Sequence, residues 1–266
     1  MAEELILDVD ELKLRRSVEA ILRNQHENGS IVASPDFAEY QFCWLRDGSF
    51  SAFALDQAGE YGASARYHSW VNDAVSGISE IIDGVIDAQV RGEVLNPLQM
   101  PPARFALDGS TVIDDWPNFQ IDGYGTWLWS LGQHLALRGV DGVPSNLRHS
   151  VERVARYLSA FATSTCYDVW EENGDARHTS TLACVYGGLM AAGRLLEMDE
   201  YVARAKEVQA GVVESASEVG FFVKSSTNGD VDASSLWLSE PFGVVDPADE
   251  YFSKTVALIE DRLTFD

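Results

Sequence analysis

Apolar residues recur at helical spacing along almost the whole chain, and this periodicity limits the possible folds more than any other feature of the sequence. The spacing, with glycine at several expected stops, predicts helices at about 11–25, 47–59, 64–78, 121–138, 146–163, 178–196, 199–217 and 248–263. Strand-like runs are few and short, such as GFFVKS at 220–225. The expected fold class is therefore mostly α.

The connections between these helices are of two kinds. Those at 58–62 and 138–146 are tight, whereas those at 28–44, 96–119 and 161–175 are long and rich in aromatic and polar residues. Alternating short and long loops predict stacked helical hairpins with the long loops gathered at one end. Long loops inside a compact domain usually carry function. We expect one domain over 1–266, with its site in these loops.

The chain is strongly acidic, with 42 acidic and 19 basic residues and a net charge of -23. Acidic residues are spread along the whole sequence, which argues against binding to nucleic acid or to an anionic membrane. The N-terminus lacks the basic lead and cleavage site of a secretory signal, so we expect a cytoplasmic protein. Because salt screens self-repulsion, we expect a salt-rich cytoplasm. Equal stability in dilute buffer and in molar salt would refute this.

The sequence gives no sign of a metal or cofactor site. Cys43, Cys166 and Cys184 are odd in number and lack metal-ligand spacing, so we expect buried thiols. The five histidines also lack a ligand motif, and no phosphate-binding glycine loop or nucleophile elbow is present.

Three stretches in or beside the long loops combine aromatic rings with charged or amide groups. They are YQFCWLRDGS at 40–49, DDWPNFQIDGYGTW at 114–127 and DVWEENGD at 168–175. Sugar rings stack their apolar faces on aromatic side chains, and sugar hydroxyls accept or donate paired hydrogen bonds to carboxylates, amides and guanidinium groups. Together the three stretches favour a carbohydrate site.

Each stretch also has an ordinary structural explanation. Arg46 and Asp47 could begin and cap a helix, since aspartate is favoured at a helix N-terminus. Trp116 could anchor a loop to the core, and Glu171 with Glu172 could form a solvated acidic turn. Taken singly, none of these features specifies a function.

In their order and spacing, the motifs Y-x-x-x-W-x-R-D, W-x-x-x-Q-x-D-G and D-x-W-E-E resemble glycoside hydrolase family 15. That family comprises glucoamylases, glucodextranases and some trehalases. The stretches at 23–37, 231–245 and 254–263 also resemble its catalytic domain, so the resemblance covers about 14–263. It implies an (α/α)6 toroid with the active site at one end, and inverting hydrolysis of α-glucosidic bonds from the non-reducing end.

The resemblance also implies roles around the acid. Glu171 matches the general acid, which protonates the leaving oxygen. Glu172 matches a neighbour that binds substrate hydroxyls. Trp116 matches a tryptophan that packs over the site, with Gln120 and Asp122 as its supporting polar groups.

The remaining implied roles concern the sugar pocket. Arg46 and Asp47 match the pair that grips the terminal glucose, and Tyr40 and Trp44 match residues that line the pocket. Trp170, directly before the acid, completes the set of expected substrate-binding residues.

The sequence departs from the family pattern at its end. In the family, a further substrate-binding motif and the general base follow the segment that matches 254–263. We therefore expect a chain truncated before the general-base segment, with an incomplete toroid. Uncovered apolar helix faces would then favour self-association or a partner chain.

Several functions remain open at this point. The leading one is exo-hydrolysis of α-1,4-glucans or malto-oligosaccharides, and a trehalase or an α-1,6-glucan exo-hydrolase is the nearest alternative. A non-catalytic or partner-dependent glucan-binding protein is the alternative from another class, because it would bind maltose without releasing glucose. A helical scaffold without sugar affinity would require three accidental motif matches.

Overall fold

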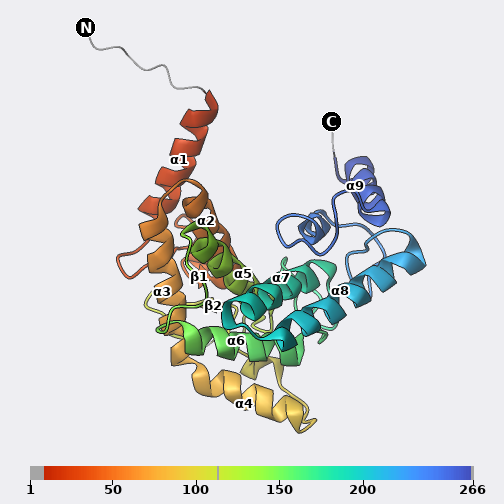
Figure 1. Cartoon of the computed structure of the whole chain (residues 1–266), viewed down its shortest axis with the longest axis horizontal. Coiled ribbons are helices and arrows are strands. Elements are labelled where there is room, and N and C mark those ends of the chain that lie inside the picture. The colour runs from red at the N-terminus through yellow and green to blue at the C-terminus, as the bar shows by residue number, and fades with distance from the viewer. Residues whose placement is uncertain (1–8, 113, 265–266) are drawn as a thin grey trace.

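The computed structural model describes residues 9–112 and 114–264. Within these residues the chain is mostly helical, and Figure 1 shows the arrangement. Among the described residues, every helix is too short or too polar to span a lipid bilayer. The α-helices and the two short strands are α1 (Val9–Arg23), β1 (Cys43–Trp44), α2 (Leu45–Gln57), α3 (Tyr61–Gly77), α4 (Ser79–Val90), β2 (Arg104–Phe105), α5 (Asp122–Leu137), α6 (Arg148–Phe161), α7 (Thr179–Leu196), α8 (Asp199–Val219) and α9 (Glu250–Leu263).

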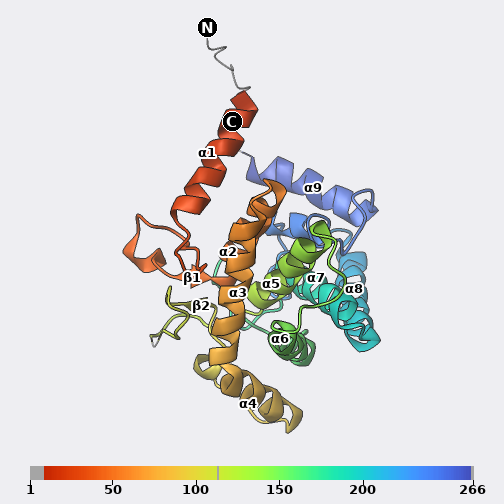
Figure 2. The same ribbon diagram turned by 60° about the vertical axis from the view of Figure 1, so that its left-hand side comes forward.

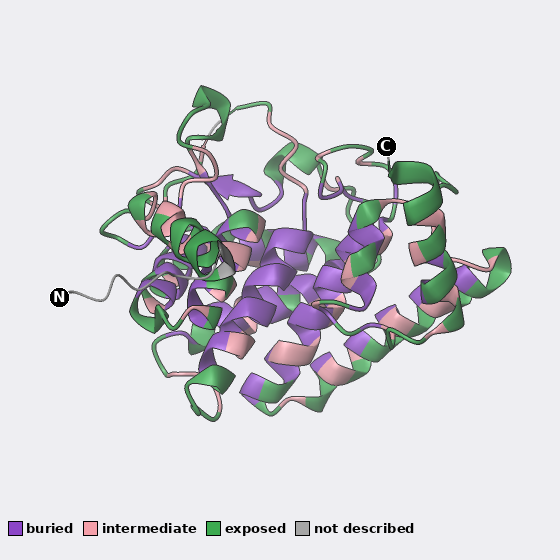
Figure 3. Ribbon diagram, turned by 90° about the horizontal axis from the view of Figure 1, so that it is seen from above, coloured by how far each residue is buried: buried purple, intermediate pink, exposed green. Residues whose placement is uncertain are grey.

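Helices α5 and α7 form the centre of the molecule. Most residues on all sides of both helices are buried, as expected for helices enclosed by other helices (Figure 3). Two glycines let them approach closely. A Cβ atom at Gly125 would collide with the carbonyl oxygen of Cys184, and one at Gly188 would lie 2.7 Å from the Cα atom of Gly125. Larger residues at either position would push the two helices apart.

The other helices build hairpins around this centre. Helix α2 packs beside α5, and α3 packs against α2. Helices α6 and α8 both pack against α7. Helices α1 and α9 lie toward one end of the molecule and α4 toward the other, in both views (Figures 1 and 2). The alternation of inner and outer helices agrees with the expected helical hairpins.

Most predicted helices are confirmed within a few residues, including the stop of α2 before Gly59, whose φ is +83°. Helix α4 was not predicted, since only Ile78 separates it from α3. The predicted strand at 220–225 is wrong. Phe222 there is buried against α9, where its amide donates to Thr255 Oγ1 at 2.8 Å, and Ser225 forms only isolated bridges. These single bridges do not extend into a ladder, so the run forms no strand in the described part of the chain.

The three cysteines are free and buried, as predicted. Burial raises the pKa of Cys43 and of Cys166 to about 12, so these thiols stay protonated at neutral pH. They act as small core residues.

Candidate active site

The N-terminal ends of the three inner helices converge on one region. Arg46 and Asp47 lie in the first turn of α2, and Asp122 is the first residue of α5. The loop before α7 carries Glu171. Helix N-termini favour carboxylates because their amide groups carry partial positive charge. This arrangement therefore suits the three acidic groups that the motifs place here.

Arg46 connects the motifs of α2 and α5. Its Nη1 donates to Asp122 Oδ2 at 2.8 Å and to Gln120 Oε1 at 3.3 Å, and its Nε lies 3.6 Å from Asp47 Oδ2. Burial opposes the charge of Arg46, but Asp122 and Asp47 outweigh it and raise the pKa of the guanidinium. The side chain of Asp122 is 0% exposed, so Arg46 is the cation that compensates a buried carboxylate.

One oxygen of Glu171 accepts three hydrogen bonds. Its Oε1 accepts from Trp44 Nε1 at 2.8 Å, Gln120 Nε2 at 3.0 Å and Trp116 Nε1 at 3.1 Å. Indole and amide nitrogens are donors only, so Oε1 acts purely as an acceptor. Any proton on this carboxyl group therefore sits on Oε2, for which the described residues offer no hydrogen-bond partner.

The backbone that presents Glu171 adopts an uncommon conformation. Glu171 has a φ of +64° and Asn173 a φ of +51°, in the left-handed region that favours glycine. Buried Asp168 holds this turn, because its Oδ1 accepts from the amides of Trp170 at 3.0 Å and Glu172 at 2.8 Å. The strained turn is thus fixed by a carboxylate of the same motif.

Two adjoining cavities open at this region. The smaller, of about 200 Å³, is lined by Tyr40, Trp44, Arg46, Asp47, Val169, Trp170 and Glu171. A larger cavity of about 640 Å³ shares four of these residues and adds an apolar wall that includes Phe50 and Trp237. The small cavity therefore combines aromatic faces, a cation and two carboxylates, as a sugar site requires.

Asp47 faces this cavity with a partly exposed carboxylate. Its partial burial raises its pKa, and the charge of Asp122 adds to the effect, while Arg46 lowers the pKa. The group is held beside Arg46 yet remains open to a ligand hydroxyl.

Some of the predicted residues lie elsewhere or have other partners. The side chain of Glu172 is 61% exposed, and it does not belong to the lining of either cavity. Gln120 and Asp122, expected to support Trp116, instead bond to Glu171 and Arg46. Trp116 contacts the acid through its own indole nitrogen.

Arg104 was not predicted, yet it stacks against the indoles beside the acid. Its guanidinium carbon lies 3.9 Å from the ring centre of Trp116 and 5.2 Å from that of Trp44. The side chain is buried and its Nη2 pairs with Asp114. Cation–π contacts of this kind hold the rings in place. Nothing in the stretch PPARF indicates this role, because it depends on the pairing of β2 with β1.

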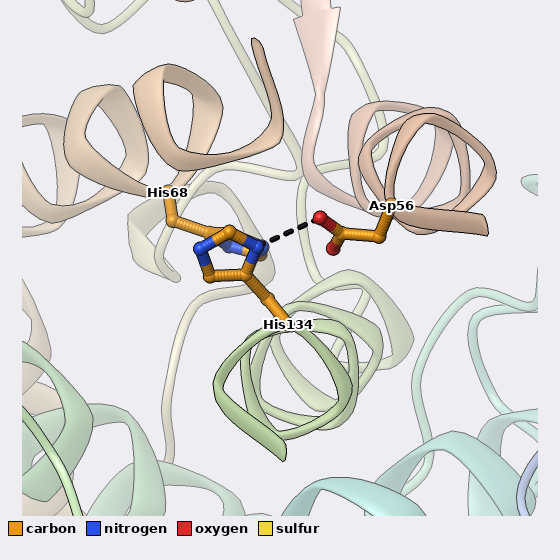
Figure 4. A group of neighbouring side chains, drawn as sticks. All are labelled: Asp56, His68 and His134. Atoms are coloured by element: carbon orange, nitrogen blue, oxygen red, sulfur yellow. Dashed lines mark hydrogen bonds and ion pairs between the residues drawn. The ribbon is translucent and has the colours of Figure 1, made fainter. Parts of the chain in front are cut away.

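A second cluster of polar groups lies at the other end of α2, about 15 Å along its axis from Arg46. It consists of Asp56, His68 and His134, and one ligand atom of each lies within 4.8 Å of the others (Figure 4). These residue types could hold a divalent metal ion. However, His134 Nδ1 bonds directly to Asp56 Oδ1 at 2.8 Å, and Ser64 Oγ bonds to Asp56 Oδ2 at 2.8 Å. Asp56 and His134 are therefore hydrogen-bonded to each other, whereas neither ring nitrogen of His68 has a hydrogen-bond partner among the described residues. The cluster does not contribute to the cavities described above.

His68 makes this cluster sensitive to pH. Burial, together with neighbouring His134, lowers the pKa of His68 to about 3. Between pH 6.5 and 3 the unfolded chain binds a proton at this residue and the folded chain does not, so stability falls as the pH falls. The expected contribution is up to about 1.4 kcal/mol per pH unit. Urea unfolding between pH 4 and 7 should show a shallower pH dependence for His68→Phe.

The control for this experiment is His149→Gln, since the side chain of His149 is 90% exposed on α6. This variant should keep the wild-type pH dependence. An unchanged slope in His68→Phe would mean that His68 titrates equally in the folded and unfolded chains.

Known proteins match this chain in sequence and in structure. The family described as Glycosyl hydrolases family 15 matches residues 12–266. The isomaltose glucohydrolase of Kribbella flavida is 37% identical over 259 residues, which cover 95% of this chain and 67% of the relative.

Two solved structures extend the comparison. A single-residue variant of a glycosidase in complex with glucose has a TM-score of 0.88 and 35% identity, covering 98% of this chain and 73% of its own. The glucoamylase of Saccharomycopsis fibuligera has a TM-score of 0.69 at 17% identity, covering 95% of this chain and 63% of its own, and it supports the fold alone. With these matches to its sequence and fold, the chain belongs to glycosyl hydrolase family 15, and its mostly helical fold matches the family's (α/α)6 barrels over the part of them that it covers.

Proposed function

We propose that this site hydrolyses a terminal α-glucosidic bond with inversion, and that Glu171 is the general acid. The observation that carries the proposal is the hydrogen bonding of Glu171. Three donors fix its Oε1, which leaves Oε2 as the position of a transferable proton beside the small cavity. A general acid needs a fixed orientation and one free protonated oxygen.

In this reaction the proton on Glu171 Oε2 passes to the glycosidic oxygen as its bond to the sugar C1 breaks. The leaving group departs as an alcohol. A water molecule attacks C1 from the opposite face, and a base takes its proton. None of the described residues is assigned as this base, because Asp47, the other carboxylate lining the small cavity, is held beside Arg46.

The remaining groups would bind and orient the terminal glucose. Asp47 and Arg46 offer an acceptor and a donor to neighbouring hydroxyls, and the rings of Tyr40, Trp44 and Trp170 offer faces for the apolar side of the sugar. Arg46 bonds to Gln120, which bonds in turn to Glu171. Sugar binding at Arg46 and Asp47 is thereby connected to the orientation of Glu171.

The linkage is also part of the proposal. The 37% identity with a protein named isomaltose glucohydrolase favours an α-1,6-linked glucose disaccharide over maltose or trehalose. The assay is made in molar salt, which screens the net charge of -23. We expect kcat/KM for glucose release to be at least about tenfold higher with isomaltose than with maltose or trehalose. Glu171→Gln is the blank. Preference for maltose would contradict the linkage, and release no faster than the blank would contradict hydrolysis by this chain.

A non-catalytic or partner-dependent glucan-binding protein is the second candidate, favoured by the unassigned base. It predicts heat of binding with isomaltose in calorimetry, loss of that heat in Asp47→Ala, and no glucose release.

The chain spans 67% of the length of the isomaltose glucohydrolase. Association with itself or a partner, and a place in a salt-rich cytoplasm, stay predictions.

A further inference from the structure

Lys224 lies beside the loop that carries Glu171, here called the acid loop (residues 168–175), although it comes from a distant part of the chain. Its backbone is fixed at both polar groups, since its amide donates to the carbonyl of Asp230 at 2.7 Å and its carbonyl accepts from the amide of Thr179 at 3.1 Å. Thr179 is the first residue of α7. The side chain is only 17% exposed. Lys224 is therefore anchored to the inner helix that follows the acid loop.

The ammonium group of Lys224 is surrounded by three carboxylates. Its Nζ lies 3.6 Å from Asp168 Oδ2, 3.5 Å from Glu172 Oε2 and 3.7 Å from Asp232 Oδ2. These distances are those of ion pairs around a compact point charge, which is how lysine acts. One positive charge is thus shared among three carboxylates.

Each of these carboxylates is tied to the acid loop. Asp168 accepts hydrogen bonds from the amides of Trp170 and Glu172. Trp170 Nε1 donates to both oxygens of Asp232, to Oδ1 at 3.1 Å and to Oδ2 at 3.2 Å. Glu172 directly follows Glu171. Hydrogen bonds from Ser234 and Trp170, with the charge of Lys224, lower the pKa of Asp232 despite its partial burial.

Asp168 depends on this cation more than the others. The residue is buried, and its Oδ2 has no hydrogen-bond partner among the described residues. Besides Lys224, the nearby polar group is His178, whose Nδ1 lies 3.8 Å from Asp168 Oδ2. The Nε2 of His178 lies 3.0 Å from the carbonyls of Cys166 and Asn173. A buried carboxylate that loses its counter-charge becomes costly, and the turn that it holds should open.

We propose that Lys224 is a positioning residue for the reaction: its charge holds Asp168, Glu172 and Asp232 together and so keeps the strained turn that aims Glu171 at Trp44, Trp116 and Gln120. This inference rests on the proposed function, since it assumes that the orientation of Glu171 limits the rate. Lys224 itself does not line the small cavity and has no chemical step.

The test compares Lys224→Met, which removes the charge, with Lys224→Arg, which keeps it. For Lys224→Met we expect kcat on isomaltose to fall about 100-fold with KM changed less than about threefold, because a displacement near 1 Å of a catalytic group has an effect of this size. Lys224→Arg should recover most of the rate. The matched control Lys206→Met, at an exposed position on α8, should behave as the wild type.

A second readout does not depend on activity. In Lys224→Met, hydrogen exchange at the amides of Trp170 and Glu172 should accelerate at least about tenfold, while α5 and α7 keep their protection. Faster exchange spread over α5 and α7 would overturn the inference, because Lys224 would then only stabilise the fold. Wild-type kcat and wild-type exchange in Lys224→Met would also overturn it. If the wild-type chain releases no glucose, the proposed function fails, and exchange still decides whether Lys224 holds the loop.

Discussion

Glu171→Gln is expected to lower kcat/KM for isomaltose by about 10²- to 10⁴-fold, the range typical of a lost general acid. The amide keeps an acceptor oxygen for Trp44, Trp116 and Gln120, so the side chain should hold its place. It carries no acidic proton for the leaving oxygen. Isomaltose binding, followed by calorimetry, should stay within a few fold of the wild type.

Glu172→Gln is the matched control, because it makes the same change at the next residue. Its side chain is exposed and lies outside both cavities, and solvent screens its ion pair with Lys224, so we expect less than a tenfold loss of kcat/KM. Equal losses in the two variants would show that the charge of this turn matters and that Glu171 has no special role as acid.

Arg46→Met is expected to destabilise the fold by about 3–5 kcal/mol, the effect of breaking a buried ion pair. Its partner Asp122 has a fully buried side chain, and its bond to Arg46 Nη1 is 2.8 Å. Removing Arg46 leaves that charge without a cation at the start of α5. Denaturant unfolding in molar salt would measure the change.

The double variant Arg46→Met with Asp122→Leu separates stability from function. Replacing both partners by apolar groups removes the uncompensated charge, so we expect most of the lost stability to return. Isomaltose affinity should remain low in both variants, since the donor beside Asp47 is gone. If Arg46→Met unfolds at the same denaturant concentration as the wild type, Arg46 does not compensate the buried charge of Asp122.

The sequence was sufficient to predict most of the helices, because α6 has a long apolar face and α5 and α7 are long segments that are apolar on most sides. The three motifs were also brought together as expected: Arg46 bonds to Asp122, and Gln120 bonds to Glu171. The helices follow from local spacing. The motifs meet across 76 and 51 residues of sequence because each lies at or just before the start of one of the adjacent helices α2, α5 and α7.

Other features depend on contacts that no local pattern encodes. Lys224 reaches Asp168 from a loop 56 residues further along the chain, and Arg104 reaches Trp116 through a two-residue strand pair. The left-handed backbone of Glu171 likewise follows from the hydrogen bonds of Asp168. The run at 220–225 has a strand-like pattern, but Phe222 packs on helices instead.

The most direct test of the central claim, that Glu171 protonates the leaving group, compares two substrates in Glu171→Gln. Isomaltose has a poor leaving group that requires a proton, whereas α-glucosyl fluoride releases fluoride with little need of one. We predict that kcat/KM relative to the wild type falls by about 10²- to 10⁴-fold for isomaltose and by less than about tenfold for the fluoride. Equal losses for both substrates would contradict the assignment of Glu171 as the general acid.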